Sequence, residues 1–360
     1  MIVERISLTH FRNFESLEVR FAPGVNVFFG DNGSGKTNLL EAIFVLCLGR
    51  SQRTAADSVL VRQGEDVYRL EGDISQDGRR QSLAVAYQRN GRKKITLDGV
   101  AIRIAELYEN VCAVSSGPED SDILSGSPSV RRTFLDIYMS QYSRSYLDNL
   151  KDYHRILSQK NAALKADMDT SAFDELLIRN GARIIKARQE FIAMLRKVAS
   201  RHYAEIAHGE ILDIEYESCV PSDMTDPVII EGALAQAVQK NAARERATGL
   251  AMVGPHRDDM TISIGDYPAR THGSQGQWRT AAVSLKLSVY EILREKRKVA
   301  PVLLLDEIFA ELDANRALRL IDAFSGYRQL FLTTAVEPPE PLRTNGGRFR
   351  ISRGTVEVLS

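Results

Sequence analysis

Residues 30–37 read GDNGSGKT and match the phosphate-binding pattern G-x-x-x-x-G-K-[ST]. In such a loop, glycines let backbone N–H groups turn inward around an anion, and the helix that follows adds partial positive charge. Lys36 is then placed to reach the β- and γ-phosphates of a nucleotide, and the Thr37 hydroxyl to hold Mg²⁺. The predicted phosphate cradle consists of Gly30, Asp31, Asn32, Gly33, Ser34, Gly35, Lys36 and Thr37.

The residues on either side of this loop predict the strand and the helix that the chemistry needs. Residues 25–29 are mostly apolar and rich in β-branched and aromatic side chains, which indicates a strand entering the loop. Residues 37–48 are mostly apolar and contain neither Gly nor Pro, which indicates a buried helix leaving it. This context argues against a chance match in a Gly-rich turn.

A pair of acidic residues follows an apolar run much later in the chain. Residues 302–305 read VLLL, which is typical of a buried parallel strand, and Asp306 and Glu307 come next. Asp306 at the strand end would hold Mg²⁺, directly or through water, and Glu307 would polarise the attacking water. An acidic turn after a core strand is the alternative, and the phosphate loop upstream favours the catalytic interpretation.

The segment GSQGQ at residues 273–277 precedes an expected helix over residues 278–298. A Ser- and Gly-containing turn that opens a helix can bind an anion, or it can be an ordinary helix cap. The loop at residues 30–37 already serves the phosphates of its own chain. Two phosphate-facing helix starts therefore suggest a shared site, in which this turn touches a nucleotide held by another copy of the chain.

Strand and helix patterns divide the chain into a head and an insertion. The first hundred residues read as strands joined by tight turns, with Asp-Gly and Asn-Gly steps that predict an antiparallel meander added to the nucleotide-binding sheet. Long helical patterns at 138–165 and 173–203 predict an antiparallel helical hairpin. We expect a discontinuous head at 1–126 and 248–360, with an inserted mainly helical domain at 127–247.

Bulk properties exclude several classes of protein. The 360 residues carry 47 Lys plus Arg and 47 Asp plus Glu, so the net charge of zero argues against a grossly basic protein that coats nucleic acid. The three cysteines lie far apart in the sequence and the histidines form no cluster with metal-ligand spacing, so we expect neither a disulfide framework nor a zinc site. Free cysteines fit a reducing cytoplasm. We expect no signal peptide and no membrane span.

In this order, the motifs resemble those of the ABC-type ATPase heads of SMC-like proteins, and within that group the RecF family of bacterial recombination mediators. The resemblance covers essentially the whole chain and predicts an α/β P-loop ABC-type ATPase head (a mixed sheet with an antiparallel β meander) plus an inserted helical domain. The segments that carry it, besides those above, are FRNF at 11–14, SGPED at 116–120, GSP at 126–128, RR at 131–132, FLD at 134–136, GPHRDD at 254–259 and ELD at 311–313.

The resemblance implies further roles for individual residues. Arg12 and Asn13 would approach the nucleotide phosphates from just after the first strand. Ser274, Gly276 and Gln277 would cap the γ-phosphate of the opposing monomer. Asp313 would lie at the seam between monomers.

The resemblance also implies a function. It implies a weak DNA-stimulated ATPase of replication, recombinational DNA repair and the SOS response to DNA damage, with ATP and Mg²⁺ as cofactors. ATP would hold a homodimer on double-stranded DNA, at junctions of single- and double-stranded DNA, and hydrolysis would release it. RecO and RecR would be partners in loading RecA, and no membrane would be involved.

The chain departs from the usual ABC pattern in ways that suit a slow switch. Gln275 stands where the signature usually has Gly, and no switch histidine follows the next strand, where Thr333 and Thr334 stand instead. Glu119 and Asp120 occupy roughly the place of the usual Q-loop glutamine. The competing classes are a transporter ATPase subunit, which would not need so large a helical insertion, and a P-loop small-molecule kinase, which leaves the signature unexplained.

Basic residues near the meander turns are candidate DNA contacts, because positive side chains on loop tips suit backbone binding without base reading. Ordinary solvated surface is the competing interpretation. His256 is either a catalytic acid or base or a structural loop residue near the nucleotide. The basic candidates are Arg50, Arg53, Arg79, Arg80, Arg89, Arg92, Lys93 and Lys94, and Arg131 and Arg132 could contact DNA, form a salt bridge between domains or start a helix.

Overall fold

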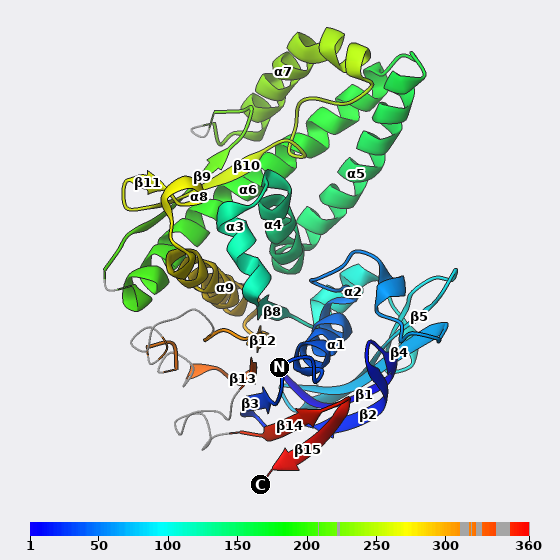
Figure 1. Ribbon diagram of the computed structural model, residues 1–360. Helices are drawn as coiled ribbons and strands as arrows, with labels where there is room; N and C mark the ends of the chain where they lie inside the picture. The colour runs from blue at the N-terminus through cyan, green and yellow to red at the C-terminus, as the bar shows by residue number, and fades with distance from the viewer. Residues whose placement is uncertain are drawn as a thin grey trace. The chain divides into compact units, whose positions relative to one another are not determined.

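The computed structural model describes residues 1–207, 209–221, 224–309, 317, 319–321, 326–335 and 346–359 (Figure 1). The chain divides into two compact units. The first unit comprises Met1–Asp120 and Lys286–Ser360, and the second unit comprises Ser121–Leu285.

A mainly parallel sheet forms the centre of the first unit. The strand order is β15-β14-β3-β13-β12-β8, in which β15 alone runs antiparallel to its neighbour. The apolar runs of β3 and β12 are buried along most of their length, as expected for parallel strands. The strands are β3 (Gly24–Phe29), β8 (Ala113–Ser116), β12 (Val302–Leu305), β13 (Gln329–Thr334), β14 (Arg348–Ser352) and β15 (Thr355–Leu359).

A second sheet of the first unit is antiparallel, in the order β2-β1-β4-β5-β6-β7. The predicted meander is therefore present, but the expectation that it extends the nucleotide-binding sheet was wrong. The meander extends the β1–β2 pair instead, because β4 aligns with β1 so that the buried side chains of Leu8 and Leu70 face each other. The strands are β1 (Ile2–Phe11), β2 (Phe14–Arg20), β4 (Val67–Gln76), β5 (Arg79–Gln88), β6 (Lys94–Leu97) and β7 (Val100–Ala101).

Two helices accompany the sheets in the first 120 residues of the first unit. Helix α1 (Lys36–Leu48) is buried along nearly all of its length and packs against β13. Helix α2 (Ile104–Asn110) lies against α1, and the short 3₁₀ turns η1 (Asp57–Val59) and η2 (Pro118–Ser121) connect elements.

The second unit is mainly helical, as predicted. The expected helix at 138–165 is two helices, because Ser143 is extended (φ −142°) and its hydroxyl accepts from Tyr146 N at 3.2 Å as an N-cap. The expected pairing of the two long helices is confirmed, since α5 packs along α6. The helices are α3 (Asp122–Ser125), α4 (Pro128–Tyr142), α5 (Arg144–Lys165), α6 (Ser171–Ile206), α7 (Pro227–Thr248) and α8 (Ala269–His272).

The second unit also contains a small antiparallel sheet in the order β11-β10-β9, and it extends further along the chain than the sequence predicted. Strands β9 (Leu212–Glu217) and β10 (Asp259–Ile264) pair along their whole length, and β11 (Tyr267–Pro268) adds an edge. This pairing holds residues 248–285 in the second unit, whereas the sequence placed the start of the returning head at 248. Helix α9 (Gln275–Arg297) then carries the chain from the second unit back into the first.

Candidate nucleotide-binding site

The glycines of the GDNGSGKT loop adopt conformations that other residues avoid. Gly30, Gly33 and Gly35 have φ of 142°, 78° and 116°. A Cβ on Gly30 would lie 2.3 Å from the carbonyl oxygen of Ile351, so the loop begins in a space that only glycine fits. Lys36 starts α1, and its Nζ donates to the carbonyls of Gly30 and Asp31 at 2.7 and 3.0 Å. The lysine is thus folded over the mouth of the loop, where anionic phosphates would replace the carbonyls.

The structure brings Thr37 and Asp306 together, as the motif spacing predicts. Thr37 Oγ1 donates to Asp306 Oδ1 at 2.9 Å, across 269 positions of sequence. Asp306 is buried directly after β12, and the parallel neighbour β13 places Thr333, its next-to-last residue, beside it. Thr333 Oγ1 also donates to Asp306 Oδ1, at 2.6 Å, and accepts from the backbone N–H of Glu307 at 2.8 Å.

Thr333 therefore fixes both acidic residues, a role that the sequence did not predict for it. Its position follows from the parallel pairing of β12 with β13, because the carboxyl ends of parallel strands meet at one edge of the sheet, and no residue pattern around Thr333 signals it. Glu307 itself has a φ of 44°, an uncommon value for a non-glycine residue that marks a constrained turn after the strand.

The chemistry of this corner fits a magnesium ion. Among the described residues, no group of three or more His, Cys, Asp or Glu could hold a metal without help. Magnesium commonly uses one or two carboxylates together with substrate phosphates and water, so a single aspartate beside a threonine hydroxyl is a suitable protein contribution. The hydroxyl and the carboxylate already point at each other at 2.9 Å.

Arg12 is anchored to a buried carboxylate beside the loop. It occupies the turn between β1 and β2 with a φ of 54°, and its Nε and Nη2 donate to Glu41 at 2.8 and 2.9 Å. Glu41 is fully buried in α1 and also accepts from Ser51 Oγ at 2.5 Å. The guanidinium is therefore held beside the loop through a bidentate pair with the helix that leaves it.

A cavity of about 660 Å³ opens beside Arg12 and Asn13. Its lining combines polar and basic side chains with two valines, a mixture that suits a nucleoside next to its phosphates. Apart from Arg12 and Asn13, the lining residues belong to η1 and nearby segments that carry no recognisable motif, so no sequence signal indicates that they meet a nucleotide. The further lining residues are Asn38, Arg53, Val59, Val61, Arg62 and Gln63.

The expected signature residues open α9 in the second unit. Ser274 N donates to Gln277 Oε1 at 3.0 Å, and Gln277 N donates back to Ser274 Oγ at 3.2 Å. This reciprocal pair is a capping box, so Ser274 and Gln277 cap the start of α9 within the chain. Gly276 follows in the first turn of the helix. Asp313, expected at a monomer seam, lies outside the described residues.

Comparison with known proteins identifies the family. Residues 2–338 match the model of the RecF/RecN/SMC N terminal domain. The DNA replication and repair protein RecF of Halalkalibacterium halodurans is 38% identical over 344 residues, covering 93% of this chain and 92% of the relative. The RecF of Latilactobacillus sakei is 35% identical over 347 residues, covering 93% and 92%. This chain belongs to the RecF family.

Solved structures agree with this assignment. The recombination mediator protein RecF-ATP in RecFOR pathway superposes with a TM-score of 0.92 at 34% identity, over 99% of this chain and 97% of that one. An Smc head bound to the C-winged helix domain of ScpA, at 16% identity and a TM-score of 0.56, shares the fold alone. The RecF-family chain thus has the ABC/SMC-like ATPase head fold, and RecF membership favours a repair protein over a transporter subunit or a kinase.

Two family motifs of the second unit meet in one buried polar cluster. Arg131 donates to both carboxylate oxygens of Asp259 at 2.7 and 2.8 Å, and Arg132 donates to the carbonyl of Asp258 at 2.8 Å. Arg188 of α6, which the sequence did not single out, is almost fully buried and bonds Asp136 at 2.8 Å. Both ends of the Arg131–Asp259 pair lie within this unit, so Arg131 holds the unit together.

His256 belongs to the same cluster, and both of its ring nitrogens have partners in the second unit. Its Nδ1 lies 2.6 Å from Tyr153 Oη and its Nε2 lies 3.1 Å from the carbonyl of Ala251. Burial lowers the pKa of His256 to about 4, so the ring is neutral and both nitrogens are occupied. Two residues later, burial raises the pKa of Asp258 to about 6, although Tyr216 Oη at 2.5 Å opposes the shift.

In the first unit, the partly buried Asp120 pairs with the buried Lys286. Lys286 Nζ lies 2.8 Å from Asp120 Oδ1 and donates to the carbonyl of Ser115 at 2.7 Å. Asp120 Oδ2 accepts from Gly117 N at 2.8 Å. Its neighbour Glu119 is exposed and pairs with Arg53 at 3.5 Å. Of the two acids near the expected Q-loop position, Asp120 is structural and Glu119 is accessible.

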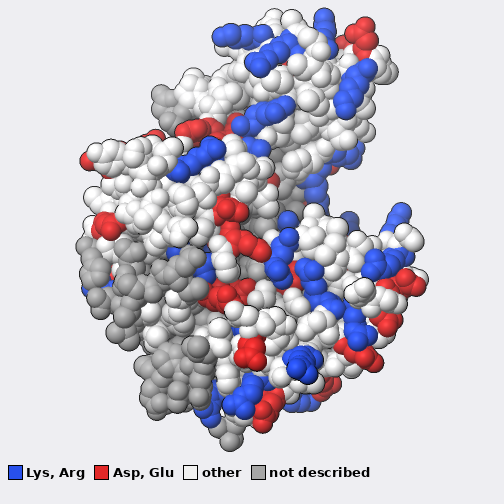
Figure 2. Space-filling model, viewed as in Figure 1, with Lys and Arg blue, Asp and Glu red and all other residues white. Residues whose placement is uncertain are grey.

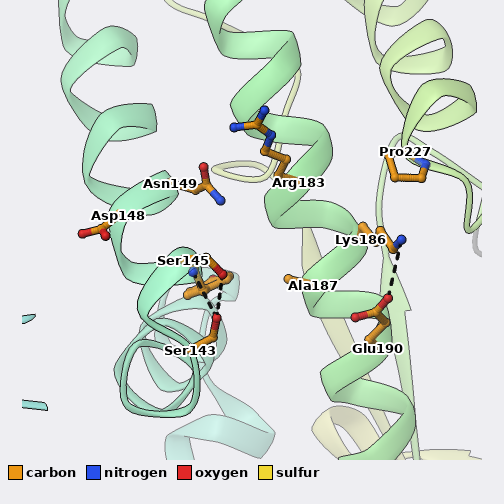
Figure 3. Close-up of a pocket in the computed structure, with 10 residues that line it drawn as sticks. Ser143, Ser145, Asp148, Asn149, Arg183, Lys186, Ala187, Glu190 and Pro227 are labelled. Atoms are coloured by element: carbon orange, nitrogen blue, oxygen red, sulfur yellow. Dashed lines mark hydrogen bonds and ion pairs between the residues drawn. The ribbon is translucent and has the colours of Figure 1, made fainter. Parts of the chain in front are cut away.

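A second cavity, of about 550 Å³, lies between α5, α6 and the start of α7 (Figure 3). Its cationic residues Arg183 and Lys186 share the lining with Asp148 and Glu190, and Lys186 lies 3.9 Å from Glu190. The charges balance, so this cavity lacks the excess positive charge that characterises a phosphate site.

The basic residues proposed as DNA contacts divide into neutralised and unpaired groups. Arg80 pairs with Glu4 and Asp73 at 3.1 Å, and Lys93 pairs with Asp57 at 2.7 Å. Figure 2 shows Lys and Arg side chains interspersed with acidic ones over the meander. Within the described ranges, three exposed cations of the meander have no ion-pair partner within 4.0 Å: Arg79, Arg92 and Lys94.

None of the described helices is long and apolar enough to cross a membrane.

Proposed function

We propose that this chain is an ATP-dependent DNA-binding protein of recombinational repair and replication. The observation that carries the proposal is the meeting of the loop threonine Thr37 with Asp306 at 2.9 Å, beside the Lys36 ammonium. A lysine, a hydroxyl and a carboxylate at the mouth of a glycine loop form the protein half of a site for a magnesium nucleotide.

ATP is the nucleotide that we assign to this site, because the RecF structures that resemble the chain include RecF-ATP and RecF-ATPrS. The loop amides would hold the phosphates, and the nucleoside would enter the cavity beside Arg12. Thr37 and Asp306 would hold Mg²⁺, which supplies charge neutralisation for phosphoryl transfer when it is bound.

Glu307 is the residue to which we assign activation of the attacking water. Its backbone is fixed by the Thr333 hydroxyl at 2.8 Å, so the carboxylate starts from a constrained turn at the end of β12. Hydrolysis would be slow, since Thr333 and Thr334 stand where ABC heads usually have a switch histidine. A slow ATPase suits a switch that releases a bound partner.

Dimerisation would complete the site. Ser274 and Gln277 open α9 with the capping box described above, and we propose that in the ATP-bound homodimer this helix start caps the γ-phosphate held by the other copy. Gly276 leaves room for close approach of a phosphate, and Asp313 would lie at the seam. One nucleotide would then contact both chains of the dimer.

Duplex DNA, and junctions of single- and double-stranded DNA, are the ligands that we propose for the dimer. The exposed cations Arg79, Arg92 and Lys94 are better candidates for phosphate contact than Arg80 or Lys93, whose charges are already neutralised. RecR, RecO and RecA are the partners proposed on the ground that the chain's structural relative RecF is described in the RecFOR pathway.

A DNA-binding titration with the Lys36→Met variant tests the gating. Wild-type chain should bind duplex DNA at least tenfold more tightly with ATP than without it, because only the ATP-bound form presents two DNA surfaces. Lys36→Met should bind equally weakly in both conditions, since it lacks the ammonium that holds the phosphates. Equal, ATP-stimulated affinity in both proteins would refute the proposal.

A further inference from the structure

The carbonyl of Ser34, in the middle of the phosphate loop, is held from outside by two hairpin turns. Asn13 Nδ2 donates to it at 3.3 Å from the β1–β2 turn. The backbone N–H of Gly354 donates to the same oxygen at 3.2 Å from the β14–β15 turn. The two turns are separated by more than three hundred residues of sequence, and both lie in the first unit.

This anchoring sets the direction of the next loop amide. A trans peptide is planar, and its C=O and N–H point in opposite directions. Holding the Ser34 carbonyl outward therefore directs the N–H of Gly35 away from the two hairpin turns. Inward-facing amides of this kind cradle the α- and β-phosphates in phosphate-binding loops.

The side chain of Asn13 is itself oriented. Asn38, in the first turn of α1, donates its Nδ2 to Asn13 Oδ1 at 2.8 Å. With its oxygen engaged there, the Asn13 amide presents its nitrogen, the donor, to Ser34. A chain of two side-chain amides thus links the start of α1 to the back of the loop.

Close packing leaves the loop little freedom on this side. A Cβ on Gly35 would lie 2.6 Å from Asn13 Nδ2, and β14 pairs with β3 up to the last residue before the loop. The turn residue Arg353 has a φ of 46° and Gly354 a φ of 80°, which is the tight geometry that brings the Gly354 N–H to the loop.

We infer that Asn13 and the β14–β15 turn at Gly354 are positioning elements that preset the phosphate loop for nucleotide. This inference rests on the proposed nucleotide site and refines the sequence expectation for Asn13. Asn13 acts on the loop from behind, through Ser34, whereas the family resemblance placed it toward the phosphates.

The two roles for Asn13 predict different nucleotide selectivity. A preset loop amide binds the α- and β-phosphates, which ADP and ATP share. Its loss therefore weakens the binding of both nucleotides by the same factor. A side chain that touched the γ-phosphate would favour ATP alone, and its loss would leave ADP unaffected.

Fluorescence titration with mant-ADP and mant-ATP on the full chain tests the inference. Asn13→Ala removes the donor and should weaken the binding of both nucleotides about three- to tenfold, the range for one hydrogen bond. Asn38→Ala should weaken both by a smaller factor, and should add nothing in an Asn13→Ala background because the two act in one chain. Gly354→Ala, which strains the second turn, should also weaken both equally.

Asn110→Ala is the matched control, since Asn110 Nδ2 donates to a backbone carbonyl at 2.8 Å at the end of α2, away from the loop. It should bind both nucleotides as the wild type does. If Asn13→Ala bound ATP more weakly but ADP unchanged, or bound both nucleotides as the wild type does, the inference would be overturned. Failure of the wild type to bind either nucleotide would overturn the proposed function and the inference with it.

Discussion

Buried polar residues organise both units of this chain, and each is placed by partners distant in sequence. Glu41 interrupts the apolar run of α1, yet it is fully buried because Arg12 and Ser51 satisfy its carboxylate. Leaving a buried carboxylate without such partners costs several kcal/mol, on the order of 3 to 5 when one partner of a buried pair is removed. The ionic contact thus fixes Arg12 beside the cavity that we assign to the nucleoside.

Two residues of the GPHRDD segment respond to pH in opposite directions. His256 has a pKa lowered to about 4 from 6.5, so its contribution to folding is complete above pH 6.5 and is lost as pH falls toward 4. Asp258 has a pKa raised to about 6 from 3.8, so its contribution is complete below pH 3.8 and is lost as pH rises through 6. Between pH 4 and 6, the two residues therefore change the free energy of unfolding in opposite directions as pH changes.

Replacing one of these residues should reveal the pH dependence of stability that the other residue causes. Relative to wild type, Asp258→Asn should lose stability as pH falls from 6.5 to 4.5, and His256→Gln should gain it, each by at most about 1.4 kcal/mol per pH unit. Urea unfolding at both pH values measures the difference. Parallel pH profiles for the wild type and both variants would show that neither group titrates as burial dictates.

At the scale of elements, a buried lysine ties three helices of the second unit together. Lys160 of α5 lies 2.6 Å from Asp174 of α6 and 2.5 Å from Glu245 of α7. Glu245 is also buried and accepts from the backbone N–H of Met252 at 2.7 Å, so both of its oxygens are engaged. The helical pattern of the sequence predicts these helices but not the ion pairs that join them.

Lys160→Ala should destabilise the second unit by about 3 kcal/mol or more, because it strands Glu245 without a counter-charge. Arg179→Ala is the control: its pair with Glu175 at 3.1 Å is exposed and should contribute less than about 1 kcal/mol. Urea denaturation followed by circular dichroism compares the two. A smaller loss for Lys160→Ala than for Arg179→Ala would contradict the structural role of the triad.

Local patterns predicted the elements better than their pairing. The strand before the phosphate loop, α1 and β12 follow from apolar runs and the motif, and Thr37 and Asp306 meet as predicted. The separate meander sheet and the β9–β10 pairing did not follow, because strand partners depend on contacts between distant segments. The role of Thr333 and the partners of Arg12 and Asn13 were missed for the same reason, since no local signal marks them.

At the scale of the whole molecule, the motifs are divided between two units. The phosphate loop, Asp306 and Glu307 belong to the first unit, and Ser274, Gly276 and Gln277 belong to the second. We propose that the two sets act on one ATP in a homodimer, so that nucleotide binding drives dimerisation. We therefore expect ATP to join two copies of the chain.

Sedimentation velocity of Glu307→Gln, with and without ATP and Mg²⁺, tests that claim most directly. The variant should bind ATP without hydrolysing it, so it should sediment as a dimer with ATP and as a monomer without it. Adding Ser274→Arg, which places a bulky side chain at the start of α9, should restore the monomer while leaving mant-ATP binding intact. A Glu307→Gln chain that binds ATP and remains a monomer would contradict the account.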